Sequence, residues 1–176
     1  TNNVGGSFST PLKLPGAGIG FYSKEPAIAL DALGAVHIAY YRTNNQLSGS
    51  GTLCYTSNAG GTFSTPFHAF TFASSHSAVT SASNISIEVD ASRQVYIATE
   101  AGAALLTFGS GASFSELAPI ASGLTDYRTI DPILRTDRNR TMHILFSAQQ
   151  NSTWLVDLLY TNNVGGSFSA PATAVS

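Results

Sequence analysis

The chain has 176 residues and a mass of 18.3 kDa, with 8 Lys and Arg against 10 Asp and Glu. That length predicts one compact domain over residues 1–176. The formal net charge of −2, with no basic run, argues against nucleic-acid binding, which needs a concentrated positive field. No apolar run approaches the roughly 20 residues that cross a bilayer, so we expect no membrane partner.

Charged residues make up 10% of the chain, and Ser, Thr, Asn and Gly are abundant in their place. This composition favours short strands with tight polar turns over long helices. The single cysteine, Cys54, excludes an internal disulfide, and its apolar neighbours predict a buried side chain. The histidines lack metal-ligand spacing and no Gly-rich loop opens a helix, so we expect no metal and no cofactor. The polar, lysine-poor composition favours a secreted or cell-surface protein.

A short segment recurs along the chain. Residues 1–9, Thr-Asn-Asn-Val-Gly-Gly-Ser-Phe-Ser, recur identically at 161–169, with a close relative at 56–64 and a degenerate copy at 107–114. Self-similarity at a period of about 50 residues indicates a repeat architecture. The repeats run over about 1–55, 56–106 and 107–160, and 161–176 repeats the N-terminal strand.

A second pattern has the same period. Asp31, Asp90 and Asp137 each end an alternating apolar run, and another run follows within five residues. We interpret each Asp as the first residue of a β-hairpin turn, where its side chain bonds local amides. The predicted strands are 26–31, 35–42, 51–57 and 62–70, then 84–90, 94–99, 103–108 and 113–120, then 132–137, 141–147, 154–161 and 167–174.

Repeated four-stranded units of this length predict an all-β fold, a β-propeller of antiparallel blades. We expect three blades per chain plus a duplicated outer strand, and essentially no helix. A β-sandwich is the alternative, but it does not explain the fixed repeat.

The recurring segment resembles the Asp-box (BNR-like repeat), Ser/Thr-x-Asp-x-Gly-x-Thr/Ser-Trp/Phe, of sialidase-like and lectin-like β-propellers, with Asn in the Asp place. The matching residues are Thr1, Asn3, Gly5, Ser7 and Phe8, then Thr56, Asn58, Gly60, Thr62 and Phe63, then Thr161, Asn163, Gly165, Ser167 and Phe168. The degenerate copy departs, because Gly109 stands where Asn or Asp is expected. The resemblance implies a structural segment between the third and outermost strands of each blade, away from the ligand face.

Three blades are too few, since propellers close with about four to eight. We therefore predict self-association, with a homodimer that closes a six-bladed ring as the favoured form. The alternative is a piece of a longer tandem protein. Residues 1–15 are predicted to be the outer strand of a preceding blade, and 161–176 supply the same strand for the last blade, so the two copies favour strand exchange.

Ligands of propellers usually meet the face where the innermost strands begin, a fold-level analogy. Six residues before each turn Asp stand Glu25, Asn84 and Asp131, which we predict to surround the channel and to bind a cation or sugar hydroxyls. The alternative is that they only hydrate the channel mouth. The loops that lead into these strands add the candidates Tyr22, Lys24, His76, Asp126, Tyr127 and Arg128. Trp154 is expected to pack.

The favoured function is a non-catalytic binding or scaffold module with a glycan as its ligand. Glycoside hydrolysis needs two carboxylates or a tyrosine and an acid at a defined separation. The sialidase resemblance also implies an arginine cluster, and Arg128 is the only arginine near these loops, so we predict no catalytic residue. The alternatives are a fragment of a sialidase-like glycoside hydrolase and a purely structural repeat.

Overall fold

The structure of the chain is a computed structural model that describes residues 10–15, 22–43, 51–72, 83–100, 103–121, 124, 127–164 and 166–175. These residues form twelve strands and no helix, so the expected all-β fold is confirmed for this part of the chain. Within the same ranges there is consequently no helix long and apolar enough to cross a membrane.

The strands form three four-stranded antiparallel sheets, which follow one another in chain order. Blade 1 contains β1 (Tyr22–Leu30), β2 (Val36–Thr43), β3 (Gly51–Ser57) and β4 (Phe67–Phe72). Blade 2 contains β5 (Ser83–Val89), β6 (Val95–Glu100), β7 (Ala104–Gly109) and β8 (Ala118–Pro119). Blade 3 contains β9 (Tyr127–Thr136), β10 (Met142–Gln150), β11 (Val156–Asn162) and β12 (Ala172–Val175).

The largest differences from the predicted strand bounds concern the first and the outermost strands of the blades. In blades 1 and 3 the first strand begins earlier, at Tyr22 and Tyr127, because the register shifts past Pro26 and Pro132 and pairing resumes before them. A proline has no amide hydrogen for the ladder, so a bulge at this point lets the strand continue. The outermost strands begin later than predicted, because the repeated segment forms a turn of its own.

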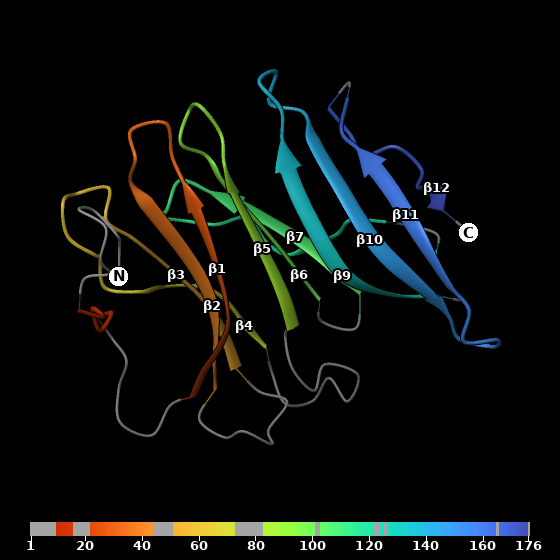
Figure 1. Ribbon diagram of the computed structural model, residues 1–176, viewed down its shortest axis with the longest axis horizontal. Coiled ribbons are helices and arrows are strands. Elements are labelled where there is room, and N and C mark those ends of the chain that lie inside the picture. Colours follow the sequence, from red (N-terminus) through yellow and green to blue (C-terminus); the bar gives the residue numbers. More distant parts are fainter. Residues whose placement is uncertain are drawn as a thin grey trace.

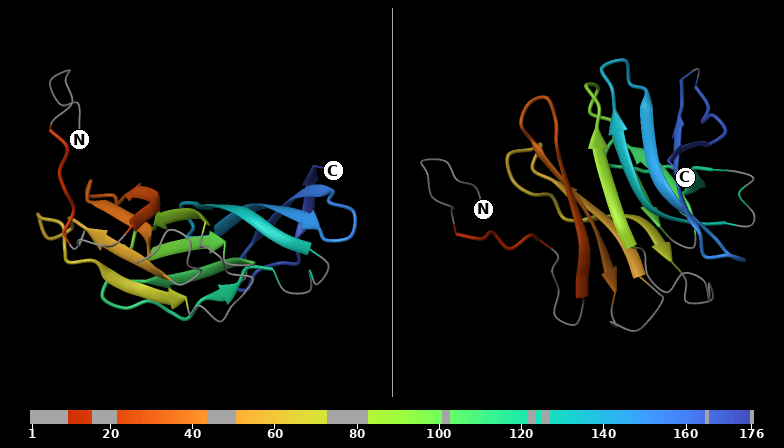
Figure 2. Two further views of the ribbon diagram at one scale, coloured as in Figure 1. Left: turned by 90° about the horizontal axis from the view of Figure 1, so that it is seen from below. Right: turned by 45° about the vertical axis from the view of Figure 1, so that its right-hand side comes forward.

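The three blades lie in an open row (Figure 1), and the turned views in Figure 2 show the same fan of sheets. Strands β1, β5 and β9 are neighbours in this row. One apolar cluster, which includes Tyr41, Leu53 and Ile97, lies between blades 1 and 2. A second, which includes Leu106 and Phe146, lies between blades 2 and 3.

One equivalent position in the three blades differs in exposure, and the difference shows that the outer face of blade 1 is uncovered. Ile28, Ile87 and Leu134 each stand three residues before the turn Asp of their blade. Ile87 and Leu134 are 4% and 0% exposed, whereas Ile28 is 67% exposed. Blades 2 and 3 bury this side chain against the blade before them, so Ile28 marks a blade face without a neighbour.

The two copies of the duplicated segment differ in structure. The C-terminal copy supplies β12, which pairs with β11. Residues 10–15 of the N-terminal copy form no strand, and residues 1–9 lie outside the described part. The predicted strand exchange and homodimer remain predictions.

Candidate functional site

The blades have two ends, which we name by the chain. The turn end carries the β1–β2, β5–β6 and β9–β10 turns, and there Oδ1 of Asp31 accepts hydrogen bonds from the amides of Leu33 and Ala35, at 2.9 and 2.8 Å. Asp90 and Asp137 accept the same pair of bonds from the amides two and four residues after them. The predicted role of these aspartates in hairpin turns is therefore confirmed.

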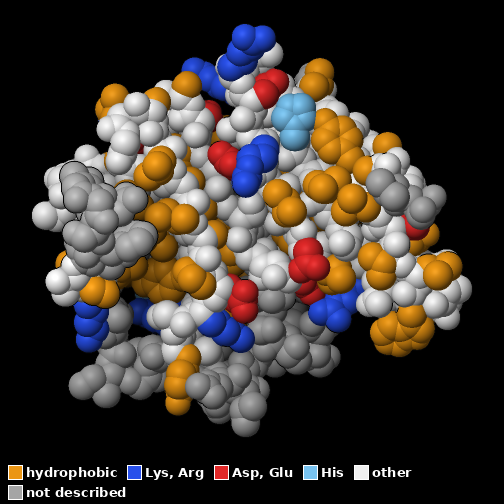
Figure 3. Space-filling view, viewed as in Figure 1, with side chains coloured by type: hydrophobic (Ala, Val, Ile, Leu, Met, Phe, Trp, Pro, Cys, Tyr) orange, Lys and Arg blue, Asp and Glu red, His pale blue; other side chains and the backbone are white. Residues whose placement is uncertain are grey.

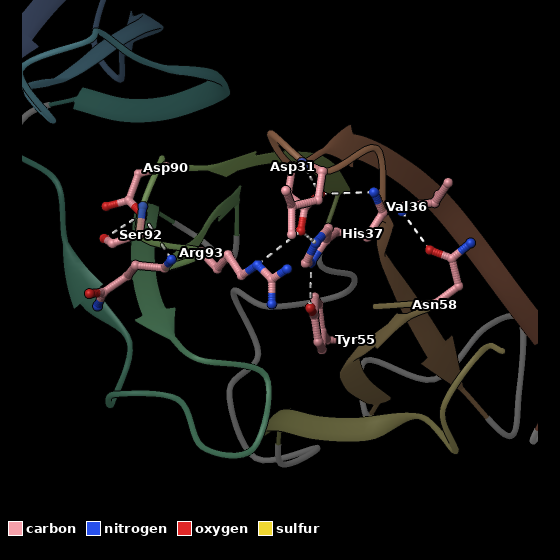
Figure 4. A network of polar contacts seen from close by, with 11 residues as sticks. Asp31, Val36, His37, Tyr55, Asn58, Asp90, Ser92 and Arg93 are labelled. Carbon is pink, nitrogen blue, oxygen red and sulfur yellow. Dashed lines mark hydrogen bonds and ion pairs between the residues drawn. The ribbon is translucent and has the colours of Figure 1, made fainter. Parts of the chain in front are cut away.

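A buried network ties blade 1 to blade 2 at the turn end (Figure 4). His37 Nε2 lies 3.6 Å from Asp31 Oδ2, and His37 Nδ1 lies 2.6 Å from the hydroxyl of Tyr55. Arg93, from the turn of the next blade, places Nε 3.5 Å from the same Asp31 oxygen. Burial lowers the pKa of His37, against the opposing effect of Asp31. Asp31 and His37 are buried, and their contacts join blade 1 to the turn of blade 2, so we assign these groups a structural role.

The repeated segments make matching contacts in blades 1 and 3. The hydroxyls of Thr56 and Thr161 donate to carbonyl oxygens eight residues later, both at 2.7 Å. Oδ1 of Asn58 accepts from the amide of Val36 at 2.6 Å, and Asn163 accepts from that of Met142 at 2.7 Å. Each segment therefore joins the third strand of its blade to the start of the second strand.

Two glycines next to the predicted motif positions have a left-handed backbone. These are Gly61 and Gly166, with φ of 93° and 99°, and they directly follow Gly60 and Gly165 in the sequence. Gly109, in the Asn place of blade 2, has no room for a side chain, because a Cβ there would lie 1.9 Å from the carbonyl oxygen of Ser113. Thr62 and Ser167 are exposed, whereas Phe63 and Phe168 are partly buried.

Several predicted positions of the segment lie outside the described residues: Thr1, Asn3, Gly5, Ser7, Phe8 and Gly165. Membership of an Asp-box family therefore stays a prediction, although the two described segments act structurally, as expected.

The opposite end, which we call the site end, is where β1, β5 and β9 begin. Glu25, Asn84 and Asp131 occupy the same place in their blades, each with a left-handed backbone at φ of 52°, 55° and 53°. The pairing register shifts at each of them. Asn and Asp tolerate this conformation better than Glu does. All three side chains are exposed and lie on adjacent strands. Counting six residues back from each turn Asp therefore identified the same structural position in the three blades.

A polar network at the site end crosses the seam between blades 2 and 3. Arg128 Nη2 donates to Glu100 Oε1 at 2.7 Å, and Asn84 Nδ2 donates to Glu100 Oε2 at 3.4 Å. The Glu100 side chain is 4% exposed, whereas that of Arg128 is 57% exposed. The structure thus brings two candidate residues together through Glu100, which the sequence reasoning missed. A carboxylate at the end of the apolar β6 run was the available signal, since a buried charge requires a partner.

The other candidates have different surroundings. Tyr22 is exposed and stands three residues before Glu25, as Arg128 stands three before Asp131. The ammonium of Lys24 lies 5.3 Å from the ring centroid of Tyr41, a cation–π contact. A mostly apolar cleft of about 250 Å³ adjoins Lys24 on the open face of blade 1.

Two further loop candidates were His76 and Asp126, which lie outside the described residues. Tyr127, by contrast, packs against the apolar cluster between blades 2 and 3, so it is a less accessible candidate than Arg128.

The site end can offer hydrogen-bond donors held in a fixed geometry. Arg128 is anchored by a buried carboxylate and still presents much of its guanidinium to solvent, while Asn84 adds an amide. Among the described residues, no group of three or more His, Cys, Asp or Glu side chains is placed to hold a metal ion.

Comparison with known proteins shows the fold. No family model matches the sequence, and no curated protein matches it. A crystal structure of a protein of unknown function from Dyadobacter fermentans has a TM-score of 0.66 at 9% identity, over 89% of this chain and 56% of that chain. The α-L-arabinofuranosidase of Podospora anserina, in complex with cellotriose, has a TM-score of 0.55 at 14% identity, and the match covers 95% of this chain and 56% of that chain. A fucose lectin from Kordia zhangzhouensis, in complex with methyl-fucoside, has a TM-score of 0.50 at 16% identity, and the match covers 86% of this chain and 99% of that chain.

The lectin and the glycoside hydrolase are β-propeller proteins. The chain has a propeller-like fold. At these identities the likeness shows the fold alone. The chain spans just over half the length of the Dyadobacter and Podospora proteins and nearly all of the lectin.

Proposed function

We propose that the chain is a carbohydrate-binding propeller module, without catalytic activity of its own, that binds a sugar at the seam between blades 2 and 3. The observation that carries this proposal is the pair of Arg128 and buried Glu100, with Asn84 beside it. Glu100 fixes the guanidinium, so the side chain of Arg128 loses less conformational freedom when a ligand binds. The remaining N–H donors of Arg128 and the amide of Asn84 suit the hydroxyls of an uncharged ligand.

The lectin and the arabinofuranosidase support carbohydrate as the ligand class, since both of those structures are complexes with sugars. The same likeness gives weak support to a secreted or cell-surface location. Neither comparison identifies the sugar that this chain binds.

Calorimetric titration with methyl fucoside and with cellotriose tests the seam site. We expect saturable binding of at least one of these probes, weakened tenfold or more by Arg128→Ala. The matched control is Arg138→Ala, which removes an exposed guanidinium at the turn end. Unchanged affinity in Arg128→Ala would mean that the sugar binds elsewhere. No heat of binding with either sugar, together with no binding on a glycan array, would favour a purely structural repeat.

Self-association completes the proposal. The face of blade 1 that carries Ile28 lacks the neighbour that buries Ile87 and Leu134, and at the other end of the row Asp137 and His143 are each 36% exposed. The equivalent Asp31 and His37 are 0% and 4% exposed, because blade 2 covers them. A second copy of the chain has the two complementary faces, so head-to-tail contact covers both and closes a six-bladed ring.

Light scattering on a sizing column tests this assembly. We expect the mass of two chains, and the mass of one chain for Ile28→Lys, which puts a charge into the contact. The control is Leu33→Lys, since Leu33 is also exposed but lies in the turn. A stable single-chain mass for the unchanged protein would contradict the ring.

A fragment of a glycoside hydrolase remains the second candidate. The arabinofuranosidase covers most of this chain, and Glu25 and Asp131 place carboxylates at equivalent positions of β1 and β9. Turnover of a fluorogenic arabinoside, lost in Asp131→Ala and kept in Asp157→Ala, would favour this reading over a binding module.

A further inference from the structure

The connection between β10 and β11 exposes three consecutive apolar side chains. Trp154, Leu155 and Val156 are 74%, 66% and 53% exposed. Figure 3 shows apolar side chains gathered over this connection, at the lower right of the molecule. The expectation that Trp154 packs is therefore wrong. A tryptophan held in water without packing is unfavourable, so an exposed cluster of this kind indicates a contact surface.

The backbone holds this tip, residues 150–156, in one shape. The amide of Trp154 donates to the carbonyl of Gln150 at 3.0 Å, and the amide of Gln150 donates to the carbonyl of Leu155 at 2.8 Å. Trp154 itself has φ of 61°, a left-handed conformation that is uncommon for a bulky residue. The indole is thus presented to solvent by a closed hairpin end.

The tip lies at the site end of blade 3. Gln150 pairs with Tyr127 and Gln149 pairs with Arg128, at the start of β9. The tip is therefore next to the strand that carries the arginine of the seam site, and it uses none of the residues of that site.

The side chains of residues 149–156 are uncharged. Residues 149–156 read Gln-Gln-Asn-Ser-Thr-Trp-Leu-Val, and Asn151, Ser152 and Thr153 are exposed. With no positive charge, the tip does not suit anionic lipid or nucleic acid. Amides and hydroxyls bond hydroxyl groups, and the face of an indole stacks on polarised C–H groups. A pyranose ring carries both, C–H groups on one face and hydroxyls at its edge.

We infer that Trp154 is the platform of a second saccharide subsite, which binds a pyranose by stacking, with Asn151, Ser152 and Thr153 as hydrogen-bonding partners. The inference rests on the proposed carbohydrate-binding function but on separate residues. Two subsites at one end of the blades suit an oligosaccharide that reaches from Arg128 to the tip.

The sole tryptophan of the chain makes the test direct. Titration of the unchanged protein with cellotriose and with methyl fucoside, monitored by tryptophan emission, is expected to give a saturable shift or quench for at least one of them. N-acetyltryptophanamide in the same sugar solutions is the control. No emission change up to 50 mM sugar, about the weakest range of single-ring stacking, would overturn the inference.

Calorimetry of variants separates this subsite from the seam site. We expect Trp154→Ala to weaken binding of the sugar that shifts the emission at least fivefold, and Leu33→Ala, an equally exposed apolar residue at the turn end, to leave it unchanged. At saturating sugar, Arg128→Ala should keep the size of the emission change even where it weakens the affinity, so failure of the seam site and failure of the tip subsite give different results. An emission shift caused by protein concentration alone would make the tip a contact between copies and would also overturn the inference.

Discussion

The two ends of the blades differ in how closely the three repeats agree. At the turn end the same contacts recur: an aspartate that accepts two backbone amides in every blade, and a threonine that bonds a carbonyl oxygen eight residues later. At the site end the equivalent residues differ. Tyr41, Glu100 and Ser147, each ten residues after the turn Asp, are a phenol, an acid and a hydroxyl.

This difference distinguishes residues that hold the blades together from residues that are candidates for ligand binding. A contact that recurs in every blade is explained by what every blade must do, which is to close a hairpin and pack on its neighbour. The pair of Glu100 and Arg128 exists only at the seam between blades 2 and 3. At the seam between blades 1 and 2, Tyr41 fills the equivalent place and Lys24 lies over its ring. A ring of two chains would therefore contain the Glu100–Arg128 pair twice and not six times.

The largest expected effect comes from breaking a recurring contact at the turn end. Asp90→Ala removes the acceptor for the amides of Ser92 and Gln94 and for the hydroxyl of Tyr96. Because these donors are partly or wholly buried, we expect the free energy of unfolding to fall by about 2 to 4 kcal/mol, measured by urea unfolding. Sugar affinity at the site end should not change.

The matched control lies at the other end of the same type of strand. Asp131→Asn removes an exposed negative charge and keeps a residue that tolerates the left-handed backbone, so it should change the free energy of unfolding by less than about 0.5 kcal/mol. Equal losses from the two substitutions would contradict the division between scaffold and site.

The sequence predicted the recurring features well. Alternation and the spacing of Asp31, Asp90 and Asp137 predicted the strands and the turns, because local hydrogen bonds depend on nearby residues. Counting from the same aspartates placed Glu25, Asn84 and Asp131 at one position, although it did not predict their left-handed backbone.

What could not be predicted depends on how separate segments meet. The contact between Glu100 and Arg128 joins two blades, and neither residue alone indicates it. The exposure of Trp154 accompanies a left-handed backbone in the β10–β11 connection, where the sequence had predicted the first residue of a strand. The exposure of Ile28 and the partial exposure of Asp137 and His143 can be interpreted only by comparison with their buried counterparts in the other blades.

A pH titration of stability sharpens the account of the turn end. Burial lowers the pKa of His37 below 6.5, so the folded state favours the neutral ring. The contribution of His37 to the free energy of unfolding is therefore complete above pH 6.5, and it is lost as the pH falls through the lower pKa that His37 has in the folded state. Burial alone would raise the pKa values of Asp31 and Asp90, but hydrogen bonds outweigh it and hold them below 3.8, so their contribution is lost only in stronger acid.

We therefore expect the urea midpoint to fall in two steps between pH 8 and pH 2. His37→Gln should remove most of the upper step and leave the lower one. A midpoint that stays flat between pH 7 and pH 5 in the unchanged protein would mean that His37 is solvated in the folded state, against the buried network of Figure 4.

The smallest expected effect tests the strain at the site end. Glu25 has the same left-handed backbone as Asn84, but glutamate tolerates it less well than asparagine does. Glu25→Asn should therefore raise the free energy of unfolding by about 0.5 kcal/mol. Asp131→Asn should leave it nearly unchanged, because aspartate already tolerates this backbone. If Glu25→Asn destabilises the protein instead, the Glu25 side chain contributes to folding, and the site end would share in the scaffold that the turn end provides.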